Sequence, residues 1–123
     1  MAKEEWAQEE RAQRDGTQTE PTRDNPCGPV GTAILFENDE IRVWDMRVEP
    51  QGRKAWHHHT LPYLIVPMTG GRIEIENVAG DIYRGEEEAG AVLWRDAGEK
   101  HELRNLTDAP YRNILVELKR GTA

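Results

Sequence analysis

The sequence predicts an all-β domain folded as a sandwich or barrel, and three observations support this class. Short runs rich in Val, Ile, Leu, Tyr and Trp follow one another from residue 32 to residue 119. Turn signals made of Gly, Pro, Asn and Asp separate them, which favours a sandwich or barrel over alternating βαβ units. In RIEIE and RNILVEL, apolar residues alternate with charged ones, as in strands that bury one face.

The chain is expected to have an N-terminal extension followed by one folded domain. Residues 1–28 are largely polar and end in a segment rich in Pro and Gly, so they predict an extension. Its segment KEEWAQEERAQRD favours a short helix, and the alternative is an irregular or mobile tail. The folded domain is expected over residues 29–120. Its predicted strands lie at residues 32–36, 40–50, 53–59, 61–68, 72–78, 82–88, 92–96, 101–106 and 111–119.

One predicted strand, IRVWDMRV, breaks the alternation. Ile41 and Val43 share one face of this strand, so a regular strand places both on the same side. Trp44, Met46 and Val48 share the other face. Either a bulge or the burial of both faces against a partner subunit explains this pattern.

The charge balance and the cysteine content restrict the partners. The chain has 23 acidic and 16 basic residues, a formal charge of −7, and its basic residues are scattered, so we expect no nucleic-acid partner. No apolar run approaches the roughly 20 residues that cross a bilayer, and the N-terminus lacks a signal pattern. We therefore expect no membrane partner and a cytoplasmic location. Cys27 is the single cysteine, which excludes an internal disulfide and a Cys-rich zinc site.

The most informative stretch is WHHHTLPY, which holds three of the four histidines. Strand alternation places His57 and His59 on one face and His58 on the other. A closed barrel can bring His101 from a later strand to the same point, and three ligands leave positions open for water or substrate. A solvated histidine cluster is the alternative, and the triplet alone does not decide between them. Imidazoles must lose a proton to bind metal, so unperturbed histidines predict weaker binding below about pH 6.5.

The segment GAVLWRDAGEKHELRN matches the second of two motifs that define the cupin family. Gly90, Gly98, His101 and Asn105 have the spacing of that motif, and Asp96 stands where proline is usual. Asn105 and the glycines are expected to serve turns and backbone geometry. Since the match spans glycine, histidine and asparagine positions together, the chain resembles a small single-domain bacterial cupin over about residues 30–118.

The segment GRKAWHHHTLPYLIVPMTG is similar to the first cupin motif. His57 and His59 form its histidine pair, and Tyr63 and Gly70 keep its second half in register. Two positions depart from the pattern. Gly52 lies one residue closer to His57 than usual, and Tyr63 occupies the position of the family's glutamate ligand.

This resemblance implies a double-stranded β-barrel, or jelly roll, that forms a homodimer and binds a divalent metal through His57, His59 and His101. Fe(II) is the expected metal, with Mn, Ni, Zn or Cu as alternatives. The implied function is a three-histidine Fe(II) dioxygenase acting on a small organic acid, thiol or diketone. The alternatives are a Lewis-acid isomerase or lyase and a non-catalytic cupin that binds a small ligand.

The missing glutamate directs attention to Tyr63. This residue has the parity of the histidine pair, and its phenol can donate a hydrogen bond to an atom held by the metal. We therefore expect Tyr63 to be catalytic, with a barrel-lining tyrosine as the alternative. Without a carboxylate ligand, the metal keeps its full charge, which favours anionic or enolisable substrates. His58 is expected to face away, and the glutamates of GEEEAG are expected to form a solvated turn.

Overall fold

A computed structural model describes residues 20–119 of the chain, and this part is all-β. The helix expected near the N-terminus lies outside the described residues. Each predicted run contains a strand, and the strand ends agree with the predicted ones within a few residues. The strands are β1 (Ala33–Glu37), β2 (Ile41–Val48), β3 (Arg53–His58), β4 (Tyr63–Pro67), β5 (Gly71–Asn77), β6 (Ile82–Glu87), β7 (Leu93–Arg95), β8 (Lys100–Asn105) and β9 (Tyr111–Leu118).

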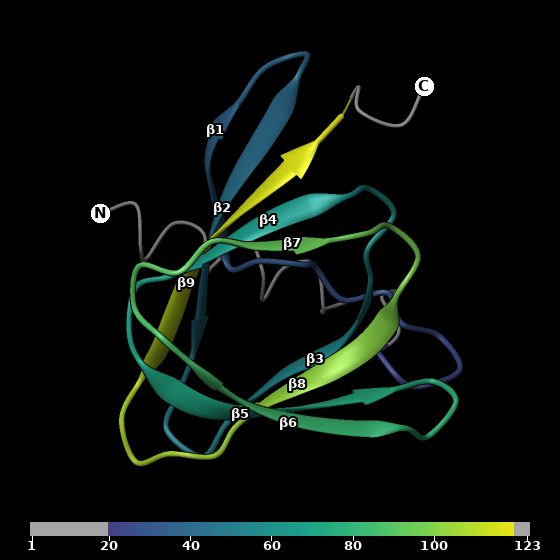
Figure 1. The fold of residues 1–123 in the computed structure, drawn as a ribbon. Coiled ribbons are helices and arrows are strands. Elements are labelled where there is room, and N and C mark those ends of the chain that lie inside the picture. Colours follow the sequence, from purple (N-terminus) through teal and green to yellow (C-terminus); the bar gives the residue numbers. More distant parts are fainter. Residues whose placement is uncertain (1–19, 120–123) are drawn as a thin grey trace.

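The strands form two antiparallel sheets that face each other across an enclosed interior (Figure 1). One sheet has five strands in the order β1-β2-β9-β4-β7, and the other has four in the order β3-β8-β5-β6. Strands distant in the sequence are neighbours, as β2 and β9 are, which is typical of a jelly roll. The predicted double-stranded β-barrel is therefore confirmed.

The core lies between the inner faces of the two sheets. In β9 every second residue is buried, as in a strand with an inner and an outer face. The buried residues include Asn113 and Glu117, whereas Ile114 and Val116 are only half-buried, so the expectation that the charged residues of RNILVEL face outward is wrong for Glu117. Tyr111 of β9 packs with Met46 and Val48 of β2 and with Ile73 and Leu103 from the opposite sheet. Burial of these apolar side chains from water stabilises the barrel.

The break in alternation predicted for β2 is not caused by a bulge in its pairing with β9. The pairing of β2 with β9 is continuous from Ile41 to Val48, so β2 itself has no bulge in this ladder. The irregularity lies in β1, between Ile34 and Phe36. Trp44, on the inner face of β2, packs against a buried cluster, whereas Ile41 on the outer face is half-buried.

The segment before β1 contacts the barrel at Arg23 and at Gly28. The Gly28 amide donates to the Trp56 carbonyl at 2.9 Å, and Gly28 forms a parallel bridge with His57. A side chain at position 28 would clash, because its Cβ would lie 2.7 Å from the Trp56 carbonyl oxygen. Arg23 lies over the Trp56 ring and pairs with Glu76. The predicted domain boundary at residue 29 thus falls beside a segment that is already in contact with β3.

Within residues 20–119 the structure contains no helix with the length and apolar character needed to cross a membrane.

Candidate metal centre

A bulge in β3 determines which of its side chains face the interior. Lys54 lies opposite Leu103 and His57 lies opposite His101, so β3 has one more residue than β8 between these pairs. Lys54 and His57 both face inward although they are three residues apart, which regular alternation does not allow. The bulge therefore turns His57 toward the interior.

His59 lies just beyond the end of β3, and backbone hydrogen bonds hold it there. Its amide donates to the Glu99 carbonyl at 2.8 Å, and its carbonyl accepts from the Gly98 amide at 2.7 Å. Gly98 has φ +117°, a conformation that residues with a side chain rarely adopt. The motif glycine thus forms the turn that fixes His59 beside β8.

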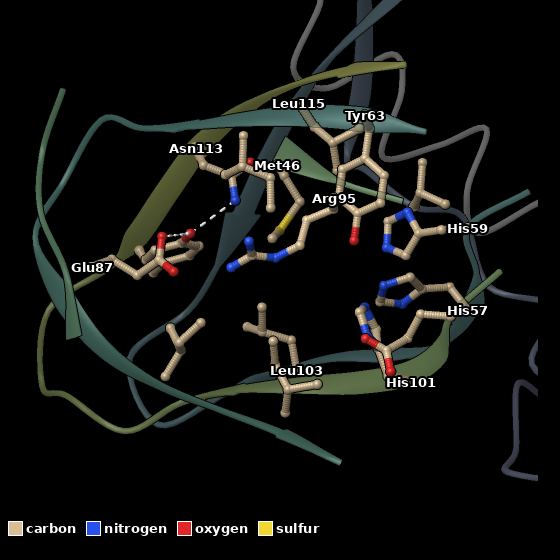
Figure 2. Close-up of a pocket in the computed structure, with 16 residues that line it drawn as sticks. Met46, His57, His59, Tyr63, Glu87, Arg95, His101, Leu103, Asn113 and Leu115 are labelled. Atoms are coloured by element: carbon tan, nitrogen blue, oxygen red, sulfur yellow. Dashed lines mark hydrogen bonds and ion pairs between the residues drawn. The ribbon is translucent and has the colours of Figure 1, made fainter. Parts of the chain in front are cut away.

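The three expected ligands converge inside the barrel (Figure 2). One nitrogen from each of His57, His59 and His101 lies within 4.8 Å of the other two. Their exposed fractions are 3%, 2% and 4%, so water does not surround them. His58 is half-buried and is not a member of this cluster. The structure therefore brings together the predicted pair and the later histidine and leaves His58 out.

All three imidazoles are neutral near pH 7 in the folded protein. Burial, together with the charge of the neighbouring histidines, lowers the pKa of His57 to about 3 and that of His59 to about 2. Burial also lowers the pKa of His101, while the Glu99 carboxylate acts in the opposite direction. A neutral imidazole is the form that binds a metal ion, so the cluster is ready to act as a ligand set without losing protons.

The ring nitrogens differ in their partners. His57 Nδ1 lies 2.7 Å from the Ala55 carbonyl, to which it can donate, and this leaves Nε2 for a ligand. Nδ1 of His59 and Nδ1 of His101 are buried without a hydrogen-bond partner among the described residues. Glu99 Oε1 approaches His101 Nδ1 to 3.2 Å, outside hydrogen-bond geometry. Because buried polar atoms are normally paired, a cation between three such rings fits the donor set.

Tyr63 stands beside the cluster, as its parity predicts. Its ring stacks on His59 with centroids 4.0 Å apart and planes 14° apart, so it fixes the orientation of that imidazole. Figure 2 shows its hydroxyl pointing into the cavity, and this hydroxyl has no hydrogen-bond partner within residues 20–119. Burial raises the pKa of Tyr63, so the phenol stays protonated and can act as a donor.

The cavity extends from the histidines toward a second polar group. Its empty volume is about 480 Å³ when the space that opens to solvent is included. At the other end the Tyr111 hydroxyl donates to Glu87 Oε1 at 3.0 Å and accepts from Asn113 Nδ2 at 2.8 Å. Arg95 also lines the cavity, between the labelled histidines and Glu87 in the view of Figure 2.

Two of these cavity residues, Glu87 and Arg95, were not predicted from the sequence. Glu87, expected in a solvated turn, instead ends β6 and lines the cavity, so that expectation is wrong for this glutamate. Arg95 lies two residues after Leu93, so both side chains point to the same face of β7, and this alternation was the only sequence signal that Arg95 faces inward. It was not usable without knowing that β7 pairs with β4, where Arg95 lies opposite Tyr63.

Comparisons with known proteins agree with the fold and its motifs. No family model matches the chain. It is 32% identical over 86 residues to the Beta-alanine degradation protein BauB of Pseudomonas aeruginosa, covering 70% of this chain and 90% of that protein. A cupin domain from Bordetella pertussis is 26% identical with a TM-score of 0.68, covering 83% of this chain and 98% of that one.

A more distant structure shows the same fold. An RmlC-like cupin family protein with a double-stranded β-helix fold, from Methanocaldococcus jannaschii, has a TM-score of 0.59 at 12% identity. The match covers 85% of this chain and 91% of that chain. Together with the two motifs and the barrel, these similarities show that the chain belongs to the cupin superfamily.

Proposed function

We propose that this cupin is a metal-dependent enzyme for a small molecule, and specifically a non-haem Fe(II) dioxygenase with three histidine ligands. The observation that carries the proposal is the cluster of His57, His59 and His101, buried and neutral at one end of a cavity. No carboxylate of the described residues belongs to this ligand cluster. The proposed substrates are small organic acids, thiols and diketones.

The residues that line the cavity have different proposed roles. The three imidazoles hold the ion, and Fe(II) bound there supplies a site at which a substrate and dioxygen meet. Tyr63 keeps His59 in place by stacking and offers a protonated hydroxyl to a substrate oxygen in the cavity. The apolar side chains of Met46 and Leu103 are buried and form part of the cavity wall.

The relative from Pseudomonas aeruginosa adds a substrate to the proposed range. Its name assigns that protein to the degradation of β-alanine, which is a small carboxylic acid. At 32% identity this similarity supports testing β-alanine and its derivatives with a thiol or carbonyl group.

A second candidate keeps the metal and changes its chemistry. Three neutral imidazoles also suit Zn(II), which acts as a Lewis acid in isomerases and lyases. A third candidate, a binding protein without turnover, needs only the apolar cavity. Activity with zinc in place of iron supports the Lewis-acid enzyme, and ligand binding without any turnover supports the binding protein.

Two measurements test the proposal. The metal content is determined by elemental analysis of protein purified without a metal column. Oxygen uptake is then followed with the iron-loaded protein across small thiol acids, diketones and β-alanine derivatives. We expect uptake with at least one class, lost in His57→Ala and retained in His58→Ala, whose imidazole lies outside the cluster. Absence of uptake across this panel in iron-loaded protein contradicts the dioxygenase.

We also propose that the protein is a homodimer that buries strand β1. Ile34, Leu35 and Phe36 are exposed by 49%, 54% and 54%, an unusual density of apolar surface on one short strand. Light scattering should give twice the chain mass, and Phe36→Glu should reduce it toward the monomer. A monomeric wild-type protein at working concentration contradicts this proposal.

A further inference from the structure

Arg95 extends into the cavity although the residue as a whole is exposed to solvent. Its position follows from strand pairing, because β7 lies next to β4 and Arg95 faces Tyr63 in the ladder. Directly opposed residues on neighbouring strands share a face, so both side chains point inward. Figure 2 shows the guanidinium inside the space that the histidines also line.

The charge of this guanidinium is not matched within residues 20–119. Most arginines there pair with a carboxylate, as Arg104 does with Glu74 and Arg112 with Asp45. Arg95 forms no such pair, and its side chain donates only to the neighbouring Trp94 carbonyl, at 3.0 Å. Most of the forked guanidinium donors therefore remain available to a ligand.

Its electrostatic reach covers both ends of the cavity. Burial raises the pKa of Tyr63 beside the histidines and of Tyr111 at the far end, and the positive charge of Arg95 acts on both in the opposite direction. Two carboxylates line the same cavity, Glu87, which accepts from the Tyr111 hydroxyl, and Glu99, which lies beside His101, and neither forms an ion pair with Arg95. The remaining walls are mainly apolar, with Leu103 and Leu115 among them. A cation in such surroundings binds a compact anion more strongly than it does in open water.

We propose that Arg95 binds the carboxylate of a small organic acid whose opposite end faces the histidine cluster. The orientation of the acid rests on the proposed function, whereas carboxylate binding by Arg95 does not. A guanidinium matches a carboxylate with two parallel hydrogen bonds, which neutral diketones and simple thiols do not reproduce. Among the proposed substrates, this selects the organic acids, including thiol acids.

The first test uses metal-free protein and therefore does not depend on the metal. An NMR titration of the labelled chain compares propanoate with propanamide, a neutral molecule of nearly the same shape. We expect propanoate to bind, propanamide to bind far more weakly, and Arg95→Met to weaken propanoate about tenfold. Arg95→Lys should restore part of the affinity. Arg72→Met, which changes an exposed arginine outside the cavity, should have no effect.

The second test adds the metal and examines the orientation. The affinity of 3-mercaptopropanoate is measured with and without Fe(II) under exclusion of oxygen. We expect the metal to increase this affinity in wild type and Arg95→Met, but not in His57→Ala. If Fe(II) does not increase the affinity of wild type for 3-mercaptopropanoate while propanoate binding still depends on Arg95, the proposed function and the orientation of the acid are contradicted. Carboxylate binding by Arg95 is not affected by that result. Equal propanoate affinity in wild type and Arg95→Met, or equal affinity for propanamide, overturns the assignment of Arg95.

Discussion

His101 and Asn105 lie four residues apart on β8, and both are almost completely buried. Asn105 is fully paired, whereas Nδ1 of His101 has no hydrogen bond to any residue of the described range 20–119. The Asn105 amide nitrogen donates to the carbonyls of Val48, Glu49 and Ala109, and its oxygen accepts from the amide and hydroxyl of Thr107.

Two residues of one sequence motif therefore have different roles, since Asn105 stabilises the fold and His101 is available to a ligand. Buried polar groups that are paired inside the chain stabilise the fold, and groups left unpaired at a cavity are available to a ligand. Asn105 thus connects the loops around β2, β8 and β9, as its expected role in turns predicts. Nδ1 of His59 and Nδ1 of His101 instead have no hydrogen-bond partner within residues 20–119.

The largest expected effect concerns the metal. His57→Ala or His101→Ala removes one of three ligands, so we expect the metal affinity to fall by at least about a hundredfold. His58→Ala is the matched control, since this neighbouring imidazole lies outside the cluster, and it should bind as wild type does. Calorimetric titration measures the metal affinity of the three variants. Equal affinity in His57→Ala and His58→Ala would exclude the cluster as the site.

Asn105→Ala should affect stability and leave the site intact. The change leaves several buried carbonyl and hydroxyl groups without partners, so the free energy of unfolding should fall by about 3 kcal/mol. Asn25→Ala, on the exposed surface, should change it by less than about 0.5 kcal/mol. Denaturant titration provides both values. If folded Asn105→Ala loses metal affinity while its stability is unchanged, Asn105 serves the site and not the fold, and the assigned role is contradicted.

The histidines also make the metal-free protein sensitive to acid. Their folded pKa values lie below the ordinary value of 6.5, so between pH 6.5 and about 3 the unfolded chain binds protons that the folded chain does not. The free energy of unfolding should therefore decrease as pH falls below 6.5, by about 1 kcal/mol per pH unit for each histidine.

Denaturant titrations of metal-free protein at several pH values test this slope. His57→Ala should reduce it, and His58→Ala should leave it nearly unchanged. A stability that is independent of pH between about 6.5 and 5 would show that the histidines are not buried in neutral form. The same burial moves metal release to a lower pH than the value near 6.5 expected from unperturbed imidazoles.

The smallest effect is expected at Glu99. Its carboxylate lies 3.2 Å from His101 Nδ1 but is 40% exposed, so it orients this imidazole only weakly. Glu99→Gln should lower the metal affinity by about tenfold at most. Glu88→Gln is the control, and its affinity should equal that of wild type. A loss as large as that of His101→Ala would make Glu99 a ligand.

The strands and the histidine pair were predictable because they depend on local patterns. Alternation in RIEIE of β5 and the turn residues between strands are visible in the sequence, and the spacing of His57 and His59 gives their shared parity. The bulge in β3 was not predictable, because it is visible only in the pairing of β3 with β8. Arg95 and Glu87 also escaped, since their place in the cavity depends on which strands become neighbours.

X-ray absorption spectroscopy of the metal-loaded protein tests the central claim most directly. The account predicts one ion per chain with three imidazole nitrogens at about 2.0–2.2 Å, and the remaining ligands from water or buffer. The imidazole scattering should fall in His57→Ala and be unchanged in His58→Ala. An ion bound without imidazole nitrogens, or with the same imidazole scattering in His57→Ala, would contradict it.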